Sequence, residues 1–270
     1  MRNAVNIAML ATAAATTTAT AQTSEALSPP SVPEWRVDVG AATLVSPRYA
    51  GSDQTRIRPI PYLEATYRDL ARLTLREGRA RLDLTPVRSN GFYLGGEASV
   101  LFPQNERNAR LPAGFGNIPA TPELGIVGGF EVRAFQVEGR VRQAVAGHLG
   151  ATAQLGASLR FPVPGTLESG RPTIIAVGPQ ATWGDRKYAQ RFFGIDAGRA
   201  QRTGLRPYEP GDALTYGGSV TVIQPLWKQL TLIGVGSVSR LTGDAARSPI
   251  VRERTNYTAV LALAWRFQSR

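Results

Sequence analysis

The stretch Thr255–Phe267 reads TNYTAVLALAWRF and alternates between two kinds of side chain. Its even positions are mostly small or polar, whereas its odd positions include Tyr257, Leu261, Leu263, Trp265 and Phe267. A period of two residues is that of a β-strand, because successive side chains point to opposite faces. A two-faced strand of this length with aromatic residues near both ends of its apolar face is the repeating unit of a transmembrane β-barrel. We therefore predict that these five side chains face lipid.

The same alternation recurs from Glu34 onward and predicts an all-β fold, an antiparallel transmembrane β-barrel. Twelve strands are expected, over residues 34–45, 57–67, 70–85, 91–102, 122–131, 134–145, 150–161, 172–183, 187–194, 213–224, 229–241 and 255–267. Within 70–85, Glu77-Gly78 is either the turn of a hairpin or a bulge in one bent strand. We chose the bulge, because an even number of strands keeps both ends of the chain in the periplasm.

Composition narrows the class of protein further. The chain has 270 residues, no Cys, a single His and a formal net charge of +11. Without Cys there are no disulfides or thiolate metal sites, and one His disfavours a His-based metal site or classical hydrolase. The basic residues are scattered rather than gathered in a patch, which argues against nucleic-acid binding. We expect no cofactor, no metal and no catalytic residue.

The N-terminus has the features of an exported protein. Arg2 precedes the apolar, Ala-rich stretch Ile7–Ala19, and Ala19-Thr20-Ala21 is an A-x-A cleavage signal. We therefore expect a cleaved signal peptide over residues 1–21, a periplasmic linker over 22–33 and an outer-membrane barrel over 34–270. Export, the absence of Cys and aromatic strand ends together favour a barrel over a soluble β-sandwich.

Several loops and strand ends carry a resemblance to a known family. The segments are Pro47-x-Tyr49-x-Gly51-Ser52-Asp53 with Arg58 and Pro61, Arg142-Gln143-Ala144 with Gly147-His148-x-Gly150, Tyr188-x-x-x-Phe192-Phe193-Gly194, Gly204-Leu205-x-x-Tyr208-x-x-Gly211, and Arg240-Leu241-x-x-Asp244-Ala245-x-x-Ser248-Pro249-Ile250-Val251. In this order they resemble the MipA/OmpV family of outer-membrane proteins. The chain departs from the usual barrel ending, since Gln268-Ser269-Arg270 follows the aromatic Phe267.

The resemblance implies a non-enzymatic barrel in the outer membrane of a Gram-negative bacterium. Some members are described as scaffolds for murein-synthesising and murein-degrading enzymes, and others as porin-like or adhesive proteins. A scaffold or binding protein is thus the first hypothesis for this chain, with outer-membrane lipid and murein hydrolases or synthases as partners. A small porin-like channel or a surface adhesin is the alternative.

Three sets of residues are candidate sites. On the inward faces, Glu97, Glu138, Arg140, Arg142 and Arg160 either line a selective pore or fill a closed lumen with ion pairs. His148 lies in a Gly-flanked turn, where we expect its imidazole to bond nearby backbone. The segment Asp244–Val251 is a structured loop in which Asp244 caps a short helical turn and Pro249 ends it. Asp244, Ser248 and Pro249 are also its partner-binding candidates.

Overall fold

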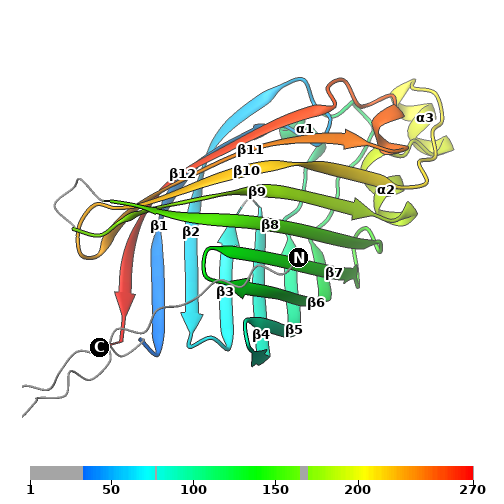
Figure 1. The fold of residues 1–270 in the computed structure, drawn as a ribbon. Helices are drawn as coiled ribbons and strands as arrows, with labels where there is room; N and C mark the ends of the chain where they lie inside the picture. The colour runs from blue at the N-terminus through cyan, green and yellow to red at the C-terminus, as the bar shows by residue number, and fades with distance from the viewer. Residues whose placement is uncertain (1–32, 77, 165–169, 270) are drawn as a thin grey trace, which may run out of the picture. The chain divides into compact units, whose positions relative to one another are not determined.

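The computed structural model describes residues 33–269 apart from residue 77 and residues 165–169. The predicted signal peptide and nearly all of the predicted linker lie outside these residues. The described chain forms a closed antiparallel barrel of twelve strands (Figure 1), as the alternation predicts. The strands are β1 (Trp35–Pro47), β2 (Thr55–Tyr67), β3 (Ala71–Arg76), β4 (Arg79–Ser89), β5 (Phe92–Leu101), β6 (Thr121–Val132), β7 (Phe135–Ala144), β8 (Ala151–Val163), β9 (Thr173–Gly184), β10 (Ala213–Pro225), β11 (Leu230–Thr242) and β12 (Thr255–Gln268).

Each strand pairs with its sequence neighbours, and β1 closes the ring by pairing with β12 from Arg36↔Gln268 to Val45↔Ala259. Every strand thus has two strand neighbours, which is the condition for a sheet to cross a bilayer, although β2 pairs with β3 over only part of its length. Ser269 extends the contact beyond β12, because its backbone N–H donates to the carbonyl oxygen of Trp35 at 3.1 Å.

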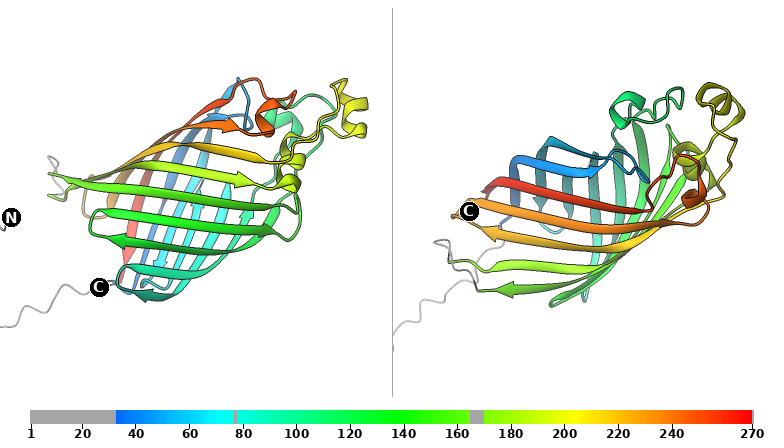
Figure 2. Two further views of the ribbon diagram at one scale, coloured as in Figure 1. Left: turned by 45° about the vertical axis from the view of Figure 1, so that its right-hand side comes forward. Right: turned by 90° about the horizontal axis from the view of Figure 1, so that it is seen from above.

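The two ends of the barrel differ. Short described turns at residues 68–70, 90–91, 133–134 and 226–229 form the turn end, where β1 begins and β12 finishes. Longer connections at residues 48–54, 102–120, 145–150, 185–212 and 243–254 form the loop end. The helices α1 (Glu106–Ala109), α2 (Arg186–Phe193), α3 (Ala197–Thr203) and the 3₁₀ turn η1 (Ala245–Arg247) all gather at the loop end (Figure 2).

Two of the twelve predicted strands are wrong, and the errors cancel in the count. Residues 70–85 are not one bulged strand, because β3 and β4 form a hairpin whose turn holds Gly78 at φ +82°. The bulge lies further on, where the pairing of β4 with β5 shifts between Leu84 and Val87. Residues 187–194 are helical instead of extended. The Asp185 carboxylate accepts the Tyr188 backbone N–H at 2.9 Å and so caps the first turn of α2.

The alternation along β12 separates an exposed outer face from a buried inner one. Tyr257 is 68% exposed and Leu261 57%, whereas Ala262 and Ala264 are 1% and 2% exposed. Leu263, Trp265 and Phe267 are likewise exposed, and large apolar side chains are exposed on the other strands as well. An apolar outer belt around a polar interior is the arrangement of a membrane-spanning barrel. None of the helices in the described part of the chain is long and apolar enough to cross a membrane.

Candidate functional site

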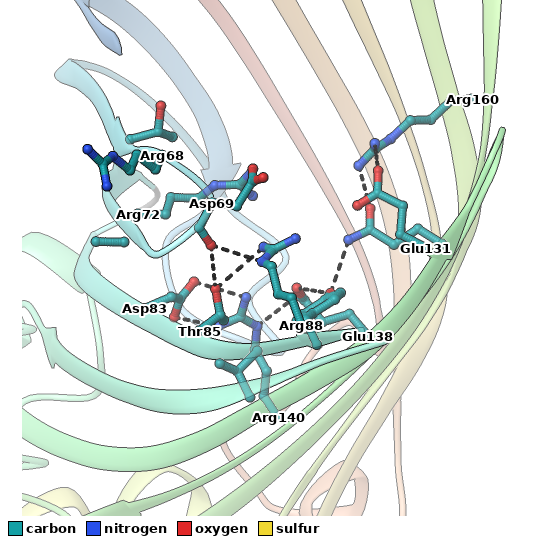
Figure 3. Close-up of a pocket in the computed structure, with 15 residues that line it drawn as sticks. Arg68, Asp69, Arg72, Asp83, Thr85, Arg88, Glu131, Glu138, Arg140 and Arg160 are labelled. Atoms are coloured by element: carbon teal, nitrogen blue, oxygen red, sulfur yellow. Dashed lines mark hydrogen bonds and ion pairs between the residues drawn. The ribbon is translucent and has the colours of Figure 1, made fainter. Parts of the chain in front are cut away.

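A network of ion pairs on β4, β5 and β7 occupies one side of the barrel interior (Figure 3). The Arg140 guanidinium lies at its centre. Its Nη1 contacts Asp83 Oδ1 at 2.9 Å and Glu97 Oε2 at 2.7 Å, and its Nε contacts Glu138 Oε1 at 2.8 Å. Because the Arg140 and Glu97 side chains are 4% and 0% exposed, each charge depends on its partners rather than on water.

The network is balanced in charge. Arg142 Nε lies 3.0 Å from Glu97 Oε1, and Arg81 Nε lies 3.3 Å from Asp83 Oδ2. Three guanidiniums (Arg81, Arg140, Arg142) therefore face three carboxylates (Asp83, Glu97, Glu138). Local neutrality of this kind reduces the cost of burying charge.

Four of the five interior candidates thus meet in one network of ion pairs. Arg160 has no ion pair with it and is connected only through hydrogen bonds, by way of Gln136 and Tyr93, to Glu138. Arg160 Nη1 pairs with Glu131 Oε1 at 2.6 Å, with both side chains about 40% exposed. Asp83 and Arg81 are not among the residues predicted for the interior, because residues 70–85 were expected to form one bulged strand, whereas they belong to the separate strand β4. Asp83 lies directly opposite Glu97 in the pairing of β4 with β5, so an interior position for Glu97 implies one for Asp83 as well.

The interior is narrow toward the turn end. A cavity of about 100 Å³ there is bordered by side chains from every strand between β2 and β8, from Thr66 on β2 to Arg160 on β8. Charged side chains dominate its lining, including Arg72, Glu131 and Glu138. Strands that lie far apart around the ring therefore share one small polar space (Figure 3).

The opposite wall, made of β9, β10 and β11, carries almost no charge. Strands β9 and β10 contain no Asp, Glu, Lys or Arg, and the single Arg240 of β11 is exposed. The side chains on the inner face are uncharged: some are small and polar, such as Ser219 and Ser237, and others are apolar, such as Ile233. A second cavity of about 190 Å³ lies between this wall and the ion-pair network, bordered by Gln180, Ser219 and Glu138.

His148 is buried at the loop end, between β7 and β8. Gly150 donates its backbone N–H to His148 Nδ1 at 3.0 Å, as expected for a turn histidine, and Nε2 contacts Glu123 Oε1 at 3.2 Å. Since Nδ1 accepts a hydrogen bond, a single proton resides on Nε2. Burial and the nearby Arg79 guanidinium lower the pKa of His148 to about 4. The Asp185 carboxylate favours the protonated form, but burial and Arg79 outweigh it.

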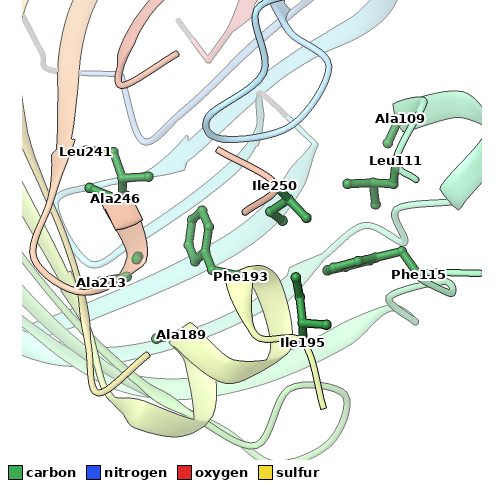
Figure 4. Packing of buried hydrophobic residues seen from close by; sticks show 11 residues of the cluster. Ala109, Leu111, Phe115, Ala189, Phe193, Ile195, Ala213, Leu241, Ala246 and Ile250 are labelled. Atoms are coloured by element: carbon green, nitrogen blue, oxygen red, sulfur yellow. The ribbon is translucent and has the colours of Figure 1, made fainter. Parts of the chain in front are cut away.

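Residues from separate loops form one apolar cluster, here called the loop cap (Figure 4). Its buried members are Ala109, Leu111, Phe115, Ala189, Phe193, Ile195, Ala213, Leu241, Ala245, Ala246 and Ile250. Tyr49, which follows β1, packs against the same cluster. The contributing loops follow β1, β5, β9 and β11, which are spread around the ring. A cluster that they share must therefore lie across the mouth of the barrel.

Hydrogen bonds between loops hold the cap together. Tyr49 Oη donates to the Ile250 carbonyl at 3.0 Å, and Ser248 Oγ donates to the Phe193 carbonyl at 2.5 Å. Arg199, 5% exposed, donates to the carbonyl of Gly194 at 2.7 Å and stacks over the Phe115 ring at 4.1 Å. Carbonyls left free at the end of α2 are satisfied in this way.

The capping role predicted for Asp244 is wrong, although a helical turn, η1, does follow it. The Asp244 side chain makes no capping bond to η1 and instead accepts the Gly211 backbone N–H at 2.9 Å. That N–H and the Arg247 guanidinium lower the pKa of Asp244. Ser248 is 3% exposed and bonds to Phe193 of the loop cap, and the neighbouring Pro249 is half-buried.

The described residues offer no arrangement of three or more His, Asp or Glu side chains that could hold a metal ion. They also give His148 no serine or threonine hydroxyl as a hydrogen-bond partner. What the interior does offer is a constricted, charged lumen below a capped mouth. A closed antiparallel barrel with an apolar belt and this interior is a transmembrane barrel of the outer-membrane class.

The chain belongs to the MltA-interacting protein MipA family, whose pattern it matches over residues 39–267. It is a β-barrel of the Gram-negative outer membrane. The relative named "Putative outer membrane protein YiaT" of Escherichia coli (strain K12) is 26% identical over 83 residues, which are 31% of this chain. The chain spans about a third of the length of that relative, 34%.

Among solved structures, the chain is similar to three porin-like barrels. OprB of Pseudomonas putida has 10% identity and a TM-score of 0.37, over 77% of this chain and 59% of that one. OprD of Pseudomonas aeruginosa has 10% identity and a TM-score of 0.37, over 87% and 65%. An anion-selective porin from Comamonas acidovorans has 10% identity and a TM-score of 0.33, over 86% and 98%.

Proposed function

We propose that the protein is a non-enzymatic binding and scaffolding barrel whose turn end recruits murein-synthesising or murein-degrading enzymes in the periplasm. The observation that carries this proposal is the loop cap. Four loops from around the ring pack their apolar side chains over the mouth, and side chains from β2 to β8 narrow the lumen beneath. Such an interior favours a rigid support over a conduit for solutes.

The turn end has a surface suited to a protein partner. Its described turns expose the cations Arg68, Arg133 and Lys228, together with Trp227, which is 56% exposed. These side chains lie on three separate turns around the ring, and exposed Trp and Arg are residue types that are enriched in protein interfaces. A periplasmic partner with an acidic surface would complement it. The family description, MltA-interacting protein MipA, supports a murein enzyme as that partner.

The test is a pull-down of the folded, tagged protein from detergent-solubilised envelopes. Wild type should retain a murein hydrolase or synthase, and the double variant Arg133→Glu with Lys228→Glu at the turn end should lose it. Arg254→Glu, an exposed arginine at the loop end, is the matched control and should retain the enzyme. Recovery of wild-type protein with no murein enzyme, or equal retention by all three proteins, would overturn the proposal.

A small porin-like channel is the second candidate. The cavity of about 190 Å³ beside the uncharged wall favours it, because that is the space in which a solute could pass the ion-pair network. Stable ohmic steps in planar bilayers would support the channel, and their absence supports the scaffold.

A further inference from the structure

Three arginines lie together at the loop end of β2 and form what we call the outer arginine cluster: Arg48, Arg56 and Arg58. Arg56 and Arg58 pair with Ser46 and Leu44 of β1, and both are half-buried on the inner face, whereas Ile57 between them is 73% exposed on the outer face. Arg48 and Arg58 lie close enough to Arg56 for their charges to repel it.

This cluster differs from the other interior arginines. Those with carboxylate partners are Arg36, Arg76, Arg79, Arg81, Arg140, Arg142, Arg160 and Arg266. In the described part of the chain, no carboxylate forms an ion pair with Arg48, Arg56 or Arg58. Their three Nε atoms are buried and have no hydrogen-bond partner there, which is also true of some arginines with carboxylate partners, such as Arg142. Arg48 donates from Nη1 to the Asn108 carbonyl at 3.2 Å. Arg72 and Arg88, which also lack an ion pair, are exposed near the turn end and can be hydrated.

Beside the cluster, part of β2 has a strand neighbour on one side only. Strand β2 pairs with β3 only from Leu63 to Tyr67, so Thr55–Tyr62 have β1 as their only strand neighbour. Pro59 and Pro61 lie on this stretch and have no N–H to offer a further strand, which protects the edge from pairing. This gap in the strand pairing begins at the loop end, and if the chain termini lie in the periplasm, as the even number of strands predicts, this end faces the outer leaflet.

We propose that the outer arginine cluster is a binding site for a phosphate monoester group. Three guanidiniums offer forked N–H donors that match phosphate oxygens, and a dianion would offset their mutual repulsion. It would also supply acceptors to the buried Nε–H groups. The phosphate is either that of an outer-leaflet glycolipid entering through the gap or that of a free solute.

The test measures binding to purified, folded protein by titration calorimetry, with inorganic phosphate and with micelles of the phosphorylated outer-leaflet glycolipid or its dephosphorylated form. The double variant Arg56→Gln with Arg58→Gln should bind roughly tenfold or more weakly than wild type, because charge-assisted hydrogen bonds are lost. Arg160→Gln, whose ion pair lies lower in the lumen, is the matched control and should bind like wild type.

Binding of the phosphorylated glycolipid alone assigns a lipid headgroup, whereas binding of inorganic phosphate as well assigns a free phosphate. If the double variant does not fold, as judged by the absence of heat-modifiable migration, Arg58→Lys is measured instead. Lysine keeps the positive charge but lacks the forked N–H donors of the guanidinium. This variant should fold and bind more weakly than wild type. Wild-type protein that binds neither ligand, or folded cluster variants that bind as tightly as wild type, would overturn the assignment.

Discussion

The two walls of the barrel interior accommodate their polar side chains in different ways. On β4, β5 and β7, long charged side chains meet in a balanced network around Arg140, and most of them are buried. On β9, β10 and β11, the inner face carries uncharged residues, both small polar ones and the apolar Ile233, and a cavity of about 190 Å³ remains against it. The charged wall is held by buried ion pairs, whereas the uncharged wall borders free space. The charged wall should be sensitive to single changes, and the uncharged wall should be tolerant.

The largest expected effect is the loss of the central cation. Arg140→Met leaves Asp83, Glu97 and Glu138 with an uncompensated buried charge, which should destabilise the barrel by about 3 to 5 kcal/mol. Arg160→Met removes an exposed pair and should cost about 1 kcal/mol or less. Urea titration in lipid vesicles, followed by heat-modifiable migration, measures both. Equal destabilisation by the two variants would contradict the distinction between buried and exposed pairs.

A charge added to the uncharged wall should be tolerated on one face only. Val220 is 42% exposed on the outer face of β10, and arginine there should cost about 2 to 4 kcal/mol in lipid. Ser219→Arg changes the neighbouring position, where the side chain can enter the cavity beside Glu138, and should cost much less. Folding yields into vesicles compare the two. Equal yields would mean that β10 does not cross a membrane with these faces.

On β12, the neighbouring positions Leu261 and Ala262 also lie on opposite faces, but arginine substitutions there do not separate lipid exposure from packing. Ala262 is 1% exposed and packs with Tyr62 and Ile233 inside the barrel, so arginine would not fit there. Both Leu261→Arg and Ala262→Arg should therefore impair assembly, the first through lipid exposure and the second through overpacking. The same folding yields check this expectation, which normal assembly of either variant would refute.

Acid should weaken the loop end by a smaller amount. The folded-state pKa of His148 is about 4, below an unfolded value near 6.5, so the unfolded chain binds the extra proton first. Stability is fully present above pH 6.5 and falls as the pH drops toward 4. At one pH unit below the unfolded value the loss is about 1 kcal/mol. Urea midpoints against pH should show this slope in wild type and a flatter one in His148→Gln. Identical slopes would remove His148 as its source.

The smallest effect is expected from an isosteric change on the uncharged wall. Thr221 lies on β10 with no side-chain hydrogen bond among the described residues, so Thr221→Val should change the free energy of unfolding by about 0.5 kcal/mol or less. The same urea titration measures it. A loss comparable to that of Arg140→Met would show that the two walls do not differ in tolerance.

The sequence predicted the strands where alternation was long and unbroken, as in Thr255–Phe267. It failed at 187–194, where Tyr188 and Phe192 are four residues apart on one face of α2, and Asp185 was the cap that could have signalled a helix. It also assigned Glu97, Arg140 and Arg142 to the inner face. The contact between Arg140 and Asp83 could not be predicted from the sequence, because it depends on the register of three strand pairs, β4–β5, β5–β6 and β6–β7. Likewise, the loop cap joins loops that are distant in sequence.

The most direct test of the capped, constricted barrel is its conductance. Proteoliposomes in which heat-modifiable migration verifies folded protein are fused with planar bilayers, so that silence cannot come from failed insertion. The account predicts no stable steps for wild type, since Phe193, Ile250 and their neighbours cover the mouth and charged side chains narrow the lumen below. Stable ohmic steps from wild-type protein would contradict it and would establish the channel instead.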